Sequence, residues 1–147
     1  MLKIFKDLFS EKNPVITEEE KKRRLQLAAT VLMLEVSKAD GEIAQVEIDK
    51  LNEILLNEFD LDDSMISVIM SDSETESADA TSLHKFTKDI NENCDNEERI
   101  QILSYLWKIS LADNHIDSHE RHFIRKIAGL LYLTDQDINS AKSIVQR

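Results

Sequence analysis

Glycine and proline are almost absent from this chain: its 147 residues include two Gly and one Pro. Sheets made of many short strands need tight turns, and tight turns draw heavily on these two residue types. Leu, Ile, Glu, Lys and Asp dominate instead. The composition therefore predicts helices, and the length suits one domain whose folding buries roughly 68–70% of the surface of the extended chain.

Apolar residues recur at helical spacing along most of the chain and predict about seven helices. Thr17-Glu-Glu-Glu20 reads as a capping box that opens a long helix. This helix is apolar on nearly every side after Arg24, so it should be central. Asp95 with Glu98 gives a second capping signal. The other apolar faces are expected at Ile48 to Leu55, Met65 to Met70, Leu83 to Cys94, Ile100 to Ile109, Phe123 to Leu131 and Ile138 to Val145.

The two halves of the chain resemble each other. A shift of 73 residues lays Val36–Ile43 on Ile109–Ile116, and a change of one residue in register then brings Leu61 over Leu133. Apolar and acidic positions stay in phase throughout, which indicates a duplicated helix–loop–helix unit. The predicted fold is therefore all-α, a single domain of about seven helices in two pseudo-twofold-related halves.

The sequence also suggests boundaries. Residues 1–14 are expected to form a short amphipathic helix and a break at Asn13-Pro14. This helix should pack on the domain or on a second subunit of a homo-oligomer, with peripheral membrane contact through residues 2–9 as the alternative. The helical domain is expected at 15–147, with a first half at 15–72, a low-complexity acidic connection at 71–80 and a second half at 81–147.

The chain is strongly acidic, with 29 Asp and Glu against 18 Lys and Arg and a net charge of −11. Residues 57–79 contain eight acids and no base. Because this charge repels phosphate backbones, nucleic acid is not an expected partner. No stretch approaches the ~20 apolar residues of a membrane span, and the N-terminus lacks the apolar core of a signal peptide. The predicted location is the cytoplasm.

Recognisable catalytic motifs are missing from the sequence. It contains no G-x-S-x-G, no glycine-rich phosphate loop and no CxxC. Cys94, the one cysteine, has the helical spacing of a core residue, and so does Trp107. The sequence therefore predicts a non-enzymatic binding or adaptor protein, and a metal-dependent enzyme is the least favoured alternative.

Each half carries the pattern Asp-x-x-Ile-x-x-x-Glu, at Asp40 and Glu47 and again at Asp113 and Glu120. In a structural interpretation, each glutamate lies in the first turn of a helix, where the dipole favours it by about 0.3–1 kcal/mol. Asp117-Ser-His-Glu120 has the form of a capping box, whereas the alanine three residues before Glu47 is a poor cap. In a functional interpretation, the four carboxylates converge and bind a divalent cation.

Carboxylate ligands would favour calcium, magnesium or manganese. The pattern is not an EF-hand, because it lacks alternating oxygen ligands and a central glycine. Glu42, His115 and Asp117 are weaker candidate ligands. His115, His119 and His122 also suggest zinc, but their spacing falls short of HExxH, so surface histidines are the favoured interpretation.

Several short segments share the pattern of one known family: Ala39-Asp-Gly-Glu-Ile43, Leu83–Thr87, Cys94–Arg99, Leu106-Trp107, Ala112-Asp113 and Glu120–Leu133 with Ala141-Lys142. From about Leu27 onward, the chain resembles the tellurite-resistance TerB-like family, in particular its small stand-alone branch. The resemblance implies an all-helical fold with two pseudo-symmetric halves, related to the N-terminal domain of a membrane-bound J-domain co-chaperone.

The resemblance also implies a metal site in the acidic loops and a stress-related role at the inner face of the membrane. Carried over residue by residue, it implicates the same four carboxylates, with Glu42 as a weaker candidate. Asn114 and His115 depart from the glycine and acid usual in the second loop, which weakens the site on that side. A protein partner is implied, and a purely structural interaction module without metal is the alternative.

Overall fold

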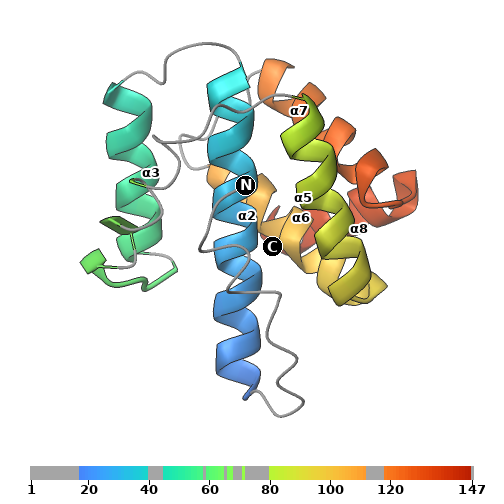
Figure 1. Ribbon diagram of the computed structural model, residues 1–147, viewed down its shortest axis with the longest axis horizontal. Coiled ribbons are helices and arrows are strands. Elements are labelled where there is room, and N and C mark those ends of the chain that lie inside the picture. Colours follow the sequence, from blue (N-terminus) through green and yellow to red (C-terminus); the bar gives the residue numbers. More distant parts are fainter. Residues whose placement is uncertain are drawn as a thin grey trace.

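The computed structural model describes residues 17–39, 45–57, 59–64, 66–67, 71, 80–111 and 118–146. Every regular element within these residues is a helix, which confirms the all-α prediction (Figure 1). The described part contains six helices of more than two turns: α2 (Glu18–Ala39), α3 (Gln45–Asn57), α5 (Ala80–Asn93), α6 (Asn96–Ser110), α7 (Ser118–Leu130) and α8 (Asp135–Gln146).

Three predicted segments lie partly or wholly outside the described residues. The helix expected from Asp62 is represented by short helical stretches at 63–64 and 66–67. The amphipathic segment at 1–14 and most of the acidic connection at 71–80 are not among the described residues. The proposed domain boundaries therefore stay predictions.

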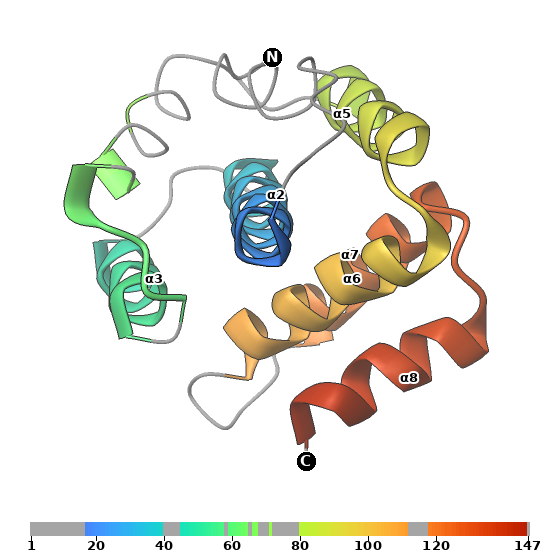
Figure 2. The ribbon, with the colours of Figure 1, turned by 90° about the horizontal axis from the view of Figure 1, so that it is seen from below.

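The long helix α2 is central, as its all-round apolar sequence predicts. Ten consecutive residues, Leu25–Leu34, are buried, so every side of this part of the helix is covered. Figure 2 shows α3, α5 and α6 arranged around it. Helix α6 packs between α2 and α8 (Figure 2). Burial of each Leu or Ile side chain in this core stabilises the folded state by about 1.5–3 kcal/mol relative to an exposed side chain.

The sequence repeat is visible in the helices. Helices α3 and α7 both contain 13 residues and begin 73 positions apart, at Gln45 and Ser118. They bury equivalent side chains: Leu51 and Ile54 in α3, Ile124 and Ile127 in α7. The repeat therefore predicts both the length and the buried face of these two helices.

Side-chain caps fix the starts of three helices. Thr17 and Glu20 form the predicted box, in which each backbone N–H donates to the other side chain. Asp95 and Glu98 form the second predicted box, at the start of α6. The structure adds a third reciprocal pair, Thr134 with Asp137, at the start of α8. These caps satisfy backbone donors that a helix start leaves without intrahelical partners.

Candidate functional site

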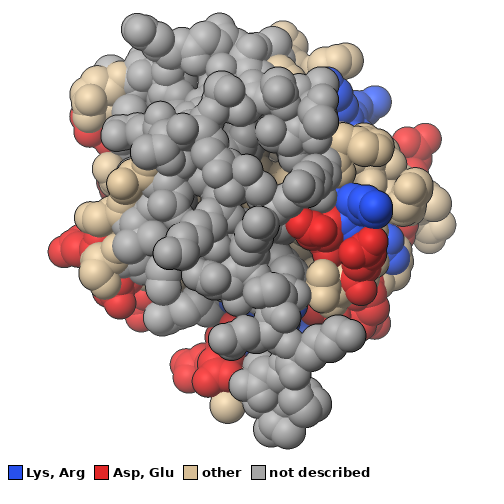
Figure 3. All heavy atoms as spheres, in the orientation of Figure 1, with Lys and Arg blue, Asp and Glu red and all other residues tan. Residues whose placement is uncertain are grey.

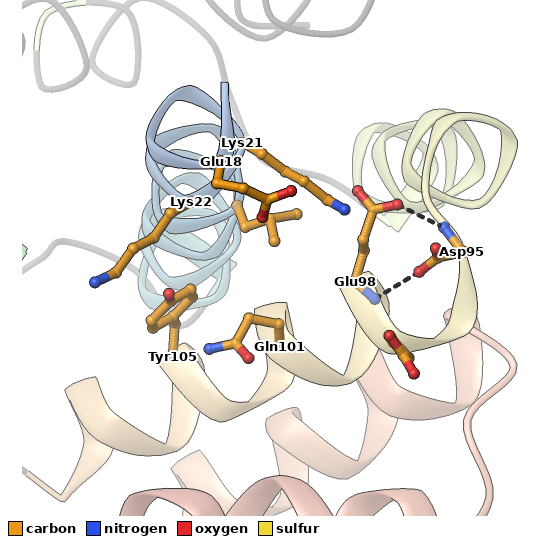
Figure 4. A pocket seen from close by; sticks show the side chains of 9 residues that line it. Glu18, Lys21, Lys22, Asp95, Glu98, Gln101 and Tyr105 are labelled. Atoms are coloured by element: carbon orange, nitrogen blue, oxygen red, sulfur yellow. Dashed lines mark hydrogen bonds between the residues drawn. The ribbon is translucent and has the colours of Figure 1, made fainter. Parts of the chain in front are cut away.

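A hollow of about 450 Å³ lies between the first turns of α2 and the first half of α6 (Figure 4). This volume is in the range of small-molecule sites, about 300–1,000 Å³. Its lining is mostly charged and polar: Glu18, Lys21, Lys22 and Leu25 from α2, then Asp95, Glu97, Glu98, Gln101 and Tyr105.

Two of the four acids in this hollow are already used by the fold. The Asp95 carboxylate accepts the Glu98 backbone N–H at 2.8 Å, and the Glu98 carboxylate accepts the Asp95 N–H at 3.3 Å (Figure 4). These bonds also place negative charge at the positive end of the α6 dipole. Asp95 and Glu98 thus have a structural role in starting α6.

Tyr105 lines the hollow from α6 and is 7% exposed. Burial raises the pKa of its hydroxyl above the ordinary value of 10, although side-chain hydrogen bonds with Gln101 and Gln26 act in the opposite direction. The Phe59 ring packs edge-on against it, with 5.1 Å between ring centroids. Tyr105 is therefore a neutral phenol at physiological pH, able to donate a hydrogen bond but unsuited to abstracting a proton.

Cys94 and Trp107 have the core roles that the sequence predicts. Burial, with a smaller effect of the neighbouring Glu98, raises the pKa of the Cys94 thiol to about 12. Such a thiol contains almost no thiolate near neutral pH, so it is a poor nucleophile. Trp107 is 2% exposed, and the Lys142 ammonium lies 5.2 Å from the centroid of its ring.

A hydrogen-bond network ties the end of α7 to α5 and α6. The Asn91 side-chain amide donates to the Leu130 carbonyl at 2.9 Å, and the Arg99 guanidinium donates to the Leu131 carbonyl at 3.2 Å. Arg99 also donates to the Asn91 side-chain oxygen at 3.3 Å. Together these bonds satisfy carbonyls that the last turn of a helix leaves without intrahelical partners.

The residue that follows this network, Tyr132, is both exposed and conformationally unusual. Its side chain is 77% exposed, and its φ of 58° is left-handed, which is uncommon for a residue other than glycine. The Tyr132 N–H donates to the Gly129 carbonyl at 3.1 Å. The next N–H in the chain, that of Leu133, donates to the Ala128 carbonyl at 2.9 Å. The turn therefore holds this aromatic ring in solvent on a fixed backbone.

The candidate cation ligands fall mostly outside the described residues. Only two of them are on described helices: Glu47 in α3, where the side chain is not described, and Glu120 in the first turn of α7. Asp40, Glu42, Asp113, His115 and Asp117 lie outside. In the part of the chain that the structure does describe, no three His, Cys, Asp or Glu side chains come together as a metal site would require. The cation site stays a prediction.

The family model described as tellurite resistance protein TerB matches residues 26–143, which is most of the chain. The chain belongs to the TerB family. No curated protein and no solved structure matches it. The match begins next to Leu27, where the sequence resemblance was expected to start, and covers α3, α5, α6 and α7 completely.

Membership of the TerB family confirms the predicted resemblance and agrees with the helical fold. TerB is not a known enzyme family, and membership by itself assigns no activity to this member. Across the described residues of this TerB-family protein, the helices are too short or too polar to cross a membrane.

Sequence reasoning missed the network that supports Tyr132. Asn91 and Arg99 lie 39 and 32 residues from the carbonyls they bind, so no local pattern reveals the contacts. The sequence indicates the turn at Tyr132 only in part. The change of register between the two repeats marks the end of a helix there, but a tyrosine does not predict left-handed backbone.

Proposed function

We propose that this TerB-family protein is non-enzymatic and that it binds a protein partner through its exposed surface. The observation that carries the proposal is Tyr132, an aromatic side chain presented to solvent on a rigid turn. Tyrosine is enriched at protein interfaces, because its large ring has few torsions to immobilise and its hydroxyl can hydrogen-bond. The Asn91–Arg99 network keeps the turn in place before a partner arrives, which lowers the entropic cost of binding.

The chemistry of the described interior supports binding over catalysis. The Cys94 thiol and the Tyr105 hydroxyl both stay protonated near neutral pH, since burial raises the pKa of each. Asp95 and Glu98 in the α2–α6 hollow are engaged in capping α6. None of these groups offers the nucleophile with an adjacent base that covalent catalysis needs.

The test is affinity capture from native lysate with three forms of the full chain. Wild type and Tyr132→Phe, which keeps the ring, should retain the same partner, and Tyr132→Gly should lose it while its circular dichroism is unchanged. Capture that is indifferent to the ring would remove Tyr132 as the binding determinant. Turnover in a general hydrolase screen, abolished by changing one polar residue, would overturn the non-enzymatic assignment.

A divalent-cation site in the acidic loops is the second candidate function. Helices α3 and α7 start at equivalent positions of the repeat, so Glu47 and Glu120 are each the third residue of their helix. This equivalence favours the site. Calcium, magnesium or manganese fits the oxygen ligands best, and His115 leaves zinc as the less favoured choice. Thermal melts with divalent cations and with a chelator test this site. Its absence would leave an interaction module without metal.

A further inference from the structure

Helix α7 carries a cationic face on an otherwise acidic protein. Arg121, His122, Arg125 and Lys126 are all exposed, and their spacing along the helix places them on one side. Among the residues that the structure describes, no acid forms an ion pair with Arg121, Arg125 or Lys126. Figure 3 shows acidic side chains at several places along the rim of one face of the described surface. We call the four α7 residues the α7 face.

The equivalent helix of the other half carries the opposite charge. Asp49 and Glu53 are exposed on α3, and Asp60 and Asp63 are exposed just after it. Leu56, on the same helix, is one of the large apolar side chains that remain exposed, at 42%. We call Asp49, Glu53, Leu56, Asp60 and Asp63 the α3 face.

The duplication makes the two faces counterparts. In the 73-residue register, Glu53 of α3 corresponds to Lys126 of α7, and Asp49 corresponds to His122. After the change of register, Asp60 corresponds to Tyr132. At the Glu53–Lys126 pair, the same helical framework therefore carries negative charge in one half and positive charge in the other.

The two faces belong to helices on different sides of the molecule. In both Figure 1 and Figure 2, α3 lies on one side of the central α2 and α7 on the other. Because α2 lies between them, the two faces of one molecule do not meet each other, and each can contact the opposite face of another molecule. A contact between different faces of two copies is heterologous and repeats head to tail.

We propose that the protein self-associates head to tail, with the α7 face of one copy on the α3 face of a second copy. Arg125 and Lys126 then lie against Glu53 and the acids that follow α3. A mostly polar hollow of about 240 Å³ lies beside Arg125 and is lined also by Asp135, Ile138 and Asn139. In the proposed contact, the exposed Leu56 side chain lies at its Ile138 edge.

The net charge of −11 selects this orientation. Two copies repel each other in most orientations, and opposite charges meet only where the α7 face approaches the α3 face. At physiological salt the screening length is about 8 Å, which weakens the long-range repulsion more than contacts between adjacent side chains. The association is therefore specific in geometry and sensitive to salt.

Sedimentation velocity of the full chain tests the proposal. Wild type should show a weight-average sedimentation coefficient that rises with concentration at about 0.15 M ionic strength, where the long-range repulsion is screened, and returns to the monomer value at about 1 M. Each neutralised side chain should weaken the association by up to about fivefold, because exposed ion pairs are individually weak. Wild type that stays monomeric at about 0.15 M ionic strength and at the highest attainable concentration would overturn the proposal.

Two neutralising variants test the head-to-tail geometry. Arg125→Gln with Lys126→Gln disables the α7 face, and Asp49→Asn with Glu53→Gln disables the α3 face. Each variant alone should be monomeric, and an equimolar mixture should form dimers and nothing larger, because only one complete interface remains. Lys88→Gln, which removes an exposed cation from α5, is the matched control and should behave as wild type.

Other outcomes of the mixing experiment contradict the proposal. Dimers formed by one variant alone would indicate a twofold contact between identical faces. A mixture that stays monomeric would exclude the pairing of α7 with α3. Neither result affects the capture of a different protein through Tyr132, so this inference and the proposed function can fail separately.

Discussion

Asp60 and Tyr132 occupy equivalent positions in the two halves, and both have left-handed backbone, with φ of 54° and 58°. In each half the leucine that follows donates its N–H back to the last turn of the preceding helix. The acceptor is the Leu55 carbonyl at 3.1 Å in the first half and the Ala128 carbonyl at 2.9 Å in the second. The same kind of C-terminal turn thus ends α3 and α7. The segment between the helix end and the left-handed residue is one residue longer in the first half.

The Tyr132 turn gives the first prediction. A left-handed conformation costs a residue with a Cβ about 1–2 kcal/mol, and replacement by glycine removes this cost. Glycine also makes the unfolded chain more flexible, which cancels about 0.4–1 kcal/mol of that gain. Tyr132→Gly should therefore raise the free energy of unfolding by about 0.5–1 kcal/mol. Urea unfolding followed by fluorescence of Trp107, the only tryptophan, measures this. Tyr132→Ala keeps the Cβ and should show no gain; a loss of stability in the glycine variant would mean that the ring packs on the domain.

The Arg99 network gives the second prediction. Arg99→Ala removes donors to the Leu131 carbonyl and to Asn91, so unfolding should become easier by about 1–2 kcal/mol. Arg121→Ala, at an exposed position of α7, is the control and should stay within about 0.5 kcal/mol of wild type. In a double-mutant cycle, Arg99→Ala and Asn91→Ala should couple by at least about 0.5 kcal/mol. Strict additivity would show that the two side chains act independently.

Cys94 gives the third prediction, on pH. Its thiol pKa is raised from 9.0 to about 12 in the folded protein, so the unfolded chain loses this proton first as pH rises. The stabilisation that this pKa difference gives the folded protein is fully present below pH 9 and is lost progressively toward pH 12. The free energy of unfolding then falls by at most about 1.4 kcal/mol per pH unit. The difference in unfolding free energy between wild type and Cys94→Ala, measured from pH 8 to 10.5, should therefore shrink as pH rises. A difference that is constant with pH would contradict the raised pKa.

Much of the fold was predictable because its determinants are local or periodic. Thr17 and Asp95 marked helix starts through residues only three positions away, and the repeat placed α3 and α7 in register. Cys94 and Trp107 were assigned to the core by spacing alone, and both are buried.

The features that sequence reasoning missed depend on tertiary contacts or on uncommon choices of residue. The Arg99 contacts cross from α6 to the end of α7, and such pairings depend on how the helices pack. Tyr132 takes a backbone conformation that glycine or asparagine would have signalled. The Thr134–Asp137 pair is local and could have been found, because threonine followed three residues later by an acid has the form of a capping box. The acidic loops stay a prediction from the repeat.

The last prediction is that divalent cations stabilise the protein through Asp40, Glu47, Asp113 and Glu120. A cation that binds only the folded state, at a hundred times its dissociation constant, adds about 2.7 kcal/mol of stability. For a domain of this size that corresponds to a rise of several degrees in melting temperature. Melts of wild type with calcium, magnesium, manganese, zinc or a chelator measure the effect, with calcium, magnesium or manganese expected to act most strongly.

Two variants on α3 separate this effect from other roles of the acids. Glu47→Gln should abolish the cation-dependent rise, whereas Glu53→Gln, which removes an exposed carboxylate from the same helix, should keep it. If the acids only stabilise helix ends, no cation will matter and Glu47→Gln will cost at most about 1 kcal/mol. If they only repel one another, Glu47→Gln will raise the melting temperature without any cation. A wild-type melt that is the same with every cation and with chelator would eliminate the metal site, because four converging carboxylates cannot bind a cation without stabilising the state that brings them together.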